Sequence, residues 1–400
     1  MSELDYYLND LDENEKIKNR DIYPRIHSID FLKGIAICLI ILVHAADMWI
    51  ENNSRYIYGF LYAGLDVFGT SLLIFLSALT VIFLWKKKMG ITPDNAIRNE
   101  ILARSLIMIG LGMIYNFFTL TKFSFPLNLW GWNIFTFIGF AHIITYYTVK
   151  LSRGSRWIIG FIIFFITDPI RELLYLGKET NHIIYILHFI IVSPNPSITL
   201  LPYIALCFFS TIFGERILEC LQLETIQAYF DTFKTLIKFG FIFLFLGLFF
   251  YGYPLVTPET LNPEEYPMVE IFPIIQNQPF YKFSGIPRFL IRGTAANLFY
   301  GLGMALLILG VSFYFLDIKL INKSFIRVVN FYGNVSLSLL LIHYVGLFLF
   351  FRKINIFFFF PIYFAYIGFL GFLMYVWLKY GKGVGTIEWI LRKIPQIIKK

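Results

Sequence analysis

The stretch FLKGIAICLIILVHAADMWI, residues 31–50, determines the fold class of this chain. A helix of about 20 predominantly apolar residues can cross the roughly 30 Å hydrocarbon core of a bilayer. The apolar residues are continuous and do not alternate, which favours a helix over a membrane-spanning strand. His44 and Asp47 interrupt this lipid-compatible pattern, and ionisable groups at such a depth need a functional or structural reason.

Similar apolar stretches recur through the 400 residues. Hydrophobic residues make up 58% of the chain, charged residues make up 15%, and the mean hydropathy is +0.67. A soluble domain carries about 25% charged residues, so this composition excludes a soluble fold. We predict an all-α, polytopic membrane helical bundle of about ten transmembrane helices, or eleven if the segment 182–192 also crosses. The expected spans are 31–50, 57–85, 101–119, 129–149, 156–175, 196–214, 236–253, 293–316, 331–351 and 354–378.

The distribution of basic residues orients the expected bundle. Lysines and arginines gather in the N-terminal tail, in alternate loops such as 86–88, and in the C-terminal tail. Because cytoplasmic loops are enriched in these residues, we expect a multi-pass cell-membrane protein with both termini in the cytoplasm. Residues 1–24 are predicted to be a poorly ordered tail without a cleaved signal peptide, 25–385 the transmembrane domain, and 386–400 a basic amphipathic tail.

Three ionisable residues of the expected spans lie at a similar depth. At about 1.5 Å per residue, His44 lies about 21 Å and His343 about 18 Å from the cytoplasmic edge, and Asp66 lies about 14 Å from the outer edge. Asp47 follows His44 by three residues and shares its helix face. This placement predicts a polar pocket in which carboxylates orient an imidazole base. The alternative is a buried hydrogen-bonded network that only joins helices, which we favour for His142.

A second group of polar residues surrounds the cytoplasmic start of the first span. It consists of Arg25, His27, Ser28, Asp30 and Lys33. A helix cap at Ser28 or Asp30 explains the group, and local signals favour this explanation. The alternative is a cationic seat for a phosphate-bearing cytosolic ligand. The three cysteines are scattered and no metal-ligand spacing is present, so we expect no metal and no nucleic-acid partner.

Several motifs occur together in one order along the chain. The segment RIHSIDFLKG (25–34) leads into an apolar run that ends in ILVHAAD, and LDVFGTSLLIFLSALTVIF (65–83) follows. LWGWNIFTFIGFAHII (129–144) comes next, then PSITLLPYIALCFFSTIFGE (196–215), FYGNVSLSLLLIHYVGLFLF (331–350) and GVGTIEWILRKI (383–394). Together they resemble the heparan-α-glucosaminide N-acetyltransferase-like membrane family, and more distantly the acyltransferase-3 membrane enzymes.

This resemblance implies an acyltransferase. Acetyl-CoA or another acyl-CoA would bind from the cytoplasm, and the acyl group would pass to an amino or hydroxyl group of a sugar or glycan on the outer side. His44 would be the catalytic base or acyl relay, and Asp47 and Asp66 would orient it or hold the acceptor. The resemblance assigns the CoA end to Arg25, Ser28, Asp30 and Lys33, and the cavity to His343, Asn334, Ser336, Trp130 and His142.

One departure from the family concerns the histidine. Eukaryotic members carry the reactive histidine in the short loop between the first two core helices, whereas residues 51–59 here contain none.

Besides the bilayer, acyl-CoA and the acceptor, a second copy of the chain is an expected partner. Two other functions remain open at this point: a proton-coupled transporter or flippase that uses His44 and Asp66, and a structural membrane protein without a cavity.

Overall fold

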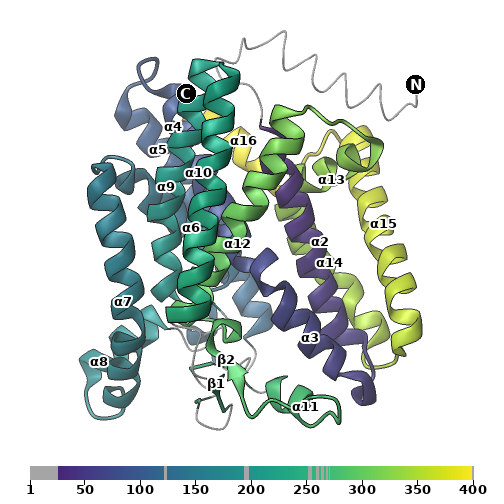
Figure 1. Cartoon of the computed structure of the whole chain (residues 1–400). Helices are drawn as coiled ribbons and strands as arrows, with labels where there is room; N and C mark the ends of the chain where they lie inside the picture. Colours follow the sequence, from purple (N-terminus) through teal and green to yellow (C-terminus); the bar gives the residue numbers. More distant parts are fainter. Residues whose placement is uncertain are drawn as a thin grey trace.

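The computed structural model describes residues 26–120, 124–192, 198–250, 255–257, 261–262, 265–266, 269 and 271–398. The predicted tail 1–24 and Arg25 lie outside the described residues. The described chain is an all-α bundle (Figure 1), which confirms the predicted fold class.

The first half of the chain supplies the helices that surround the candidate site. They are α2 (His27–Trp49), α3 (Tyr56–Leu65), α4 (Thr70–Lys88), α5 (Asp94–Thr119), α6 (Ile134–Thr148), α7 (Arg153–Gly177) and α8 (His182–Ile191). A short 3-10 turn, Asp66–Phe68, separates α3 from α4. The expected span 57–85 corresponds to one candidate membrane-crossing segment, Tyr56–Lys88, which contains this 3-10 turn.

The second half completes the bundle. Its helices are α9 (Leu200–Leu223), α10 (Ile226–Phe245), α11 (Phe272–Gln276), α12 (Ala295–Phe313), α13 (Ser324–Asn334), α14 (Ser336–Leu347), α15 (Ile356–Gly381) and α16 (Ile387–Ile398). Two-residue strands β1 (Leu255–Val256) and β2 (Ile286–Pro287) pair antiparallel. They lie with α11 at one end of the bundle, and α13 and α16 lie towards the opposite end (Figure 1).

Six described helical segments are long and apolar enough to cross a membrane, and a seventh is formed if α13 and α14, bent by 84°, count as one span. These segments identify the chain as a membrane protein. The other expected spans fall on α6, α7 and α9, of which α6 has only 15 residues. Helix α8 has ten residues, about 15 Å long, and is too short to form the eleventh span.

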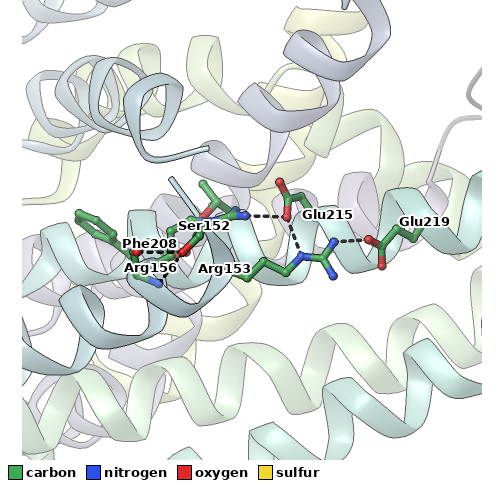
Figure 2. A network of polar contacts seen from close by, with 8 residues as sticks. Ser152, Arg153, Arg156, Phe208, Glu215 and Glu219 are labelled. Carbon is green, nitrogen blue, oxygen red and sulfur yellow. Dashed lines mark hydrogen bonds and ion pairs between the residues drawn. The ribbon is translucent and has the colours of Figure 1, made fainter. Parts of the chain in front are cut away.

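Charged residues at the ends of α7 and α9 join these helices. Arg153 lies 3.0 Å from Glu215 and also pairs with Glu219, while Arg156 donates to Glu215 at 2.7 Å (Figure 2). Arg156 is only 3% exposed. A buried guanidinium requires a carboxylate partner, so this network fixes the register of α7 against α9.

A close helix crossing joins α2 to α13. A Cβ atom at Gly34 would overlap the Val329 carbonyl oxygen, and one at Gly333 would overlap the Asp30 carbonyl oxygen. Each glycine therefore lets the backbone of the opposite helix approach, as small residues do at membrane helix interfaces. Gly333 lies one residue before the end of α13, so this contact adjoins the 84° bend between α13 and α14.

We expect Gly34→Ala and Gly333→Ala each to lower the free energy of unfolding by about 1–3 kcal/mol, because the added methyl group has no space. Gly110→Ala is the matched control, since a Cβ there meets nothing within 4 Å. Unfolding of the purified variants in detergent measures the difference. Equal stability of all three variants would show that the α2–α13 crossing is not the tight contact described.

Candidate functional site

A cavity of about 330 Å³ lies between α2, α3, the start of α4, the end of α5 and α14. Its size is within the range of small-molecule sites. Polar and aromatic side chains line it together with aliphatic ones: His44, Asp47, Tyr58, Tyr62, Asp66, Thr70, Tyr115, Asn116, Trp132, Asn133, Arg292 and Tyr344. The structure thus brings His44, Asp47 and Asp66 to one cavity.

Two histidines form the centre of the site. His44 Nδ1 lies 3.0 Å from His343 Nε2, and His343 Nδ1 lies 3.2 Å from the Leu339 carbonyl oxygen. A carbonyl oxygen only accepts, so His343 carries its proton on Nδ1 and its Nε2 accepts from His44 Nδ1–H. Neutral His44 therefore keeps an unprotonated Nε2. This is the tautomer that a general base or nucleophile needs.

Aromatic rings hold the histidine pair in place. The Tyr344 ring centroid lies 4.2 Å from that of His343 and 5.2 Å from that of His44. Tyr115 of α5 packs against Tyr344 at 5.5 Å. His343 is fully buried and His44 lines the cavity. The pair therefore has a buried member that orients and an accessible member that can react.

A buried ion pair forms another part of the cavity wall. Arg292 Nη2 lies 3.1 Å from Asp66 Oδ1, with side-chain exposures of 15% and 6%, and the same nitrogen donates to Thr70 Oγ1. Arg292 is also close enough to His44 to act on it electrostatically. The pairing satisfies both charges at a depth where an unpaired charge is costly.

Asp47 belongs to a more exposed group. Arg55 lies 3.1 Å and Arg352 lies 3.6 Å from its Oδ1 atom, and about one third of the Asp47 side chain is exposed. Among the described contacts, neither Asp47 nor Asp66 hydrogen-bonds His44; both carboxylates have arginine partners. The hydrogen-bond partner of His44 is His343, and not the carboxylate that we expected.

Buried amides stabilise the wall at the ends of α5 and α6. Asn133 accepts from two backbone N–H groups as the N-cap of α6, and its Nδ2 donates to Asn116 Oδ1 at 2.8 Å. Asn116 in turn donates to the Gly131 carbonyl oxygen at 2.8 Å. The loop that carries Trp132 into the cavity is therefore held rigidly.

The residues expected at the CoA end lie elsewhere. Asp317 accepts from the backbone N–H groups of His27 at 2.8 Å and Ser28 at 3.2 Å, so this carboxylate occupies the start of α2. The cap that we expected at Ser28 or Asp30 thus comes from Asp317, in the π-helical turn Tyr314–Ile318 that follows α12. On α2 the cavity lining begins at Leu39, and within the described part of the chain Ser28, Asp30 and Lys33 do not line it. Arg25 is outside the described residues.

The other predicted cavity residues are dispersed. Ser336 is buried in the first turn of α14, and Asn334 is the last residue of α13. Trp130 donates its indole N–H to the Phe189 carbonyl oxygen, and His142 lies on α6. In the described structure only His343 of this group contacts His44, and none of the five lines the cavity; Trp132 takes the place expected for Trp130.

Arg292 is the main residue that the sequence analysis did not select. It precedes the expected span 293–316 from the long outer loop, where helix periodicity gives no depth. Basic residues are usually enriched in cytoplasmic loops, whereas Arg292 lies on the predicted outer side, directly before an apolar span. This departure from the usual charge distribution is the feature of the sequence that could have identified Arg292.

No protein-family model matches the chain, and no curated protein is significantly similar to it. Among the described residues, no group of three or more histidine, cysteine, aspartate or glutamate side chains could hold a metal ion. The function must therefore be inferred from the cavity itself.

We expect Asp66→Asn and Arg292→Gln each to destabilise the fold by about 3–5 kcal/mol, since each leaves a buried charge without its partner. The double variant removes both charges and should lose clearly less than the sum of the two single losses. Unfolding in detergent, analysed as a double-mutant cycle, measures the coupling. Additive losses would show that the two side chains act independently.

Proposed function

We propose that this chain is a membrane-embedded acyltransferase that moves an acetyl or other acyl group from cytosolic acyl-CoA to an amino or hydroxyl group of an outer sugar or glycan. The observation that carries the proposal is the His44–His343 pair beside the cavity. Its hydrogen bonds leave one accessible imidazole nitrogen unprotonated, and a thioester needs little more than such a base and good positioning.

The chemistry follows from that nitrogen. His44 Nε2 takes the proton of the acceptor as the acceptor oxygen or nitrogen attacks the thioester carbonyl carbon. The new bond to carbon forms, the carbon–sulfur bond breaks, and the CoA thiolate takes the proton from His44. In the alternative order His44 itself first accepts the acyl group and then passes it to the acceptor.

Charged and aromatic groups around His44 suit an acceptor. Arg292 can stabilise the oxyanion that develops on the thioester carbonyl, while Asp66 keeps the guanidinium in place. Asp47 can accept hydrogen bonds from acceptor hydroxyl groups near the more exposed part of the site. Tyr58 and Trp132 provide flat apolar surfaces for a sugar ring.

The proposed topology has ten spans with both termini in the cytoplasm. It places the cavity in the outer half of the bilayer, because α2 rises from the cytoplasm and His44 lies near its outer end. The acyl-CoA arm then enters from the inner side and must run alongside α2 from Lys33 to Leu39, where the cavity lining begins. Since Asp317 caps α2, the phosphates would bind Lys33 and Arg25 by their side chains and not the helix start.

We expect His44→Ala to lower acyl transfer from acetyl-CoA by at least about 100-fold, the usual contribution of a general base, without loss of folding or membrane insertion. His182→Ala, at an exposed residue of α8, is the control. Radiolabelled acetyl transfer to sugar acceptors in membranes measures the rates. Undiminished transfer by the His44 variant would exclude it from the mechanism.

We also expect Lys33→Ala and Arg25→Ala to weaken acetyl-CoA binding, because each removes a cation from the proposed phosphate seat. Lys323→Ala, an exposed lysine on the same predicted face, should bind normally. Titration of the purified variants with acetyl-CoA gives the affinities. Unchanged affinity in both test variants would remove Lys33 and Arg25 from the proposed phosphate site.

A proton-coupled transporter or flippase is a second candidate. The buried Asp66–Arg292 pair favours it, since ionisable pairs inside apolar helices often mark ion pathways. The ion-pair partner of Asp66 is Arg292, whereas the transporter hypothesis expected Asp66 to act with His44 in proton transfer. In this case Asp66→Asn should abolish substrate-driven proton uptake in proteoliposomes, and acetyl-CoA should have no effect.

A further inference from the structure

The C-terminal helix α16 inserts a carboxylate at the bend between α13 and α14. The Leu337 and Ser338 backbone N–H groups donate to Glu388 Oε1 at 2.9 and 3.1 Å, and the Ser338 hydroxyl donates to Glu388 Oε2. The Ile387 N–H returns a hydrogen bond to Ser338 Oγ at 2.9 Å. The first turns of α14 and α16 are therefore interlocked.

This contact has a physical reason. The first N–H groups of a helix have no partner inside the helix, and those of α14 begin in the interior of the bundle, where Ser336 and Ser338 are only 6% and 4% exposed. A carboxylate satisfies two of these N–H groups and complements the positive end of the helix dipole. Glu388 thus fixes where α14 begins.

The same helix sets the histidine pair. Leu339, the residue after Ser338, supplies the carbonyl oxygen that holds His343 Nδ1 at 3.2 Å, and His343 Nε2 contacts His44 Nδ1 at 3.0 Å. A continuous series of contacts therefore runs from Glu388 through the first turn of α14 to His44. A shift of this turn would move the acceptor that selects the His343 tautomer.

We infer that Glu388 is a positioning residue for the His44–His343 pair, acting through α14. The inference rests on the proposed acyl transfer for its kinetic consequence, but the geometric consequence is independent of any reaction. It gives α16 a role in the chemistry of the cavity that Leu340 and Tyr344 of α14 line.

The test uses full-length protein labelled with ¹⁵N-histidine, which is practical because the chain has only 6 histidines. Imidazole ¹H–¹⁵N spectra distinguish the Nδ1–H from the Nε2–H tautomer. In Glu388→Gln we expect the His44 and His343 signals to shift or to show mixed tautomers. Lys393→Gln, at an exposed residue of the same helix, should leave them unchanged.

The kinetic readout complements the spectra. We expect Glu388→Gln to lower kcat by up to about 100-fold with little change in KM, as for a misplaced catalytic group. Ser338→Ala removes one of the contacts and should lower kcat by a smaller factor. This variant replaces Glu388→Gln in the test if Glu388→Gln does not fold. Unchanged histidine signals and unchanged kcat in folded Glu388→Gln would overturn the inference. If the wild-type protein shows no acyl transfer but the histidine signals respond to Glu388→Gln, only the proposed function is rejected and the positioning role of Glu388 is retained.

Discussion

The close crossing of α2 with the bent pair α13–α14 is the contact on which the cavity depends. Gly34 and Gly333 allow the two backbones to touch, and the chain then turns by 84° into α14. After this turn, α14 runs beside the C-terminal half of α2, where the Trp49 indole donates to the Leu347 carbonyl oxygen at 2.8 Å. His44 and His343, almost 300 residues apart, meet between these two helices at 3.0 Å.

Helix ends impose the second constraint. Two helices around the centre of the bundle begin at carboxylates from distant segments: α2 at Asp317 and α14 at Glu388. At the start of α12, the Thr294 hydroxyl is the N-cap, and the Asp168 carboxylate accepts weakly from the Ala295 N–H and pairs with Arg288. In an apolar environment unpaired N–H groups are costly. Each carboxylate therefore both satisfies a helix start and joins two segments of the chain.

The sequence predicts those features of the structure that depend on the position of a residue along a helix. The bounds of α2, the all-α class and the similar depth of His44 and His343 follow from apolar run length and the rise per residue. The rotation of each helix about its axis and the partner of each side chain do not follow from apolar run length or from the rise per residue. The sequence therefore suggested a carboxylate partner for His44 and could not select Trp132 over Trp130. Arg292 and the capping role of Glu388 depend on tertiary contacts that no periodicity encodes.

The cost of burying a charge explains which partners the carboxylates and His44 have. A histidine beside a carboxylate would be drawn towards its charged form, and an ion buried in the bilayer is costly unless it is fully paired. Here the carboxylates of Asp66 and Asp47 are instead neutralised by guanidinium groups, and His44 faces a second neutral imidazole. Among the described contacts, His44 is therefore hydrogen-bonded through Nδ1 to a neutral partner. Such a residue has a fixed lone pair directed by its neighbour, which is the property that acyl transfer from a thioester requires.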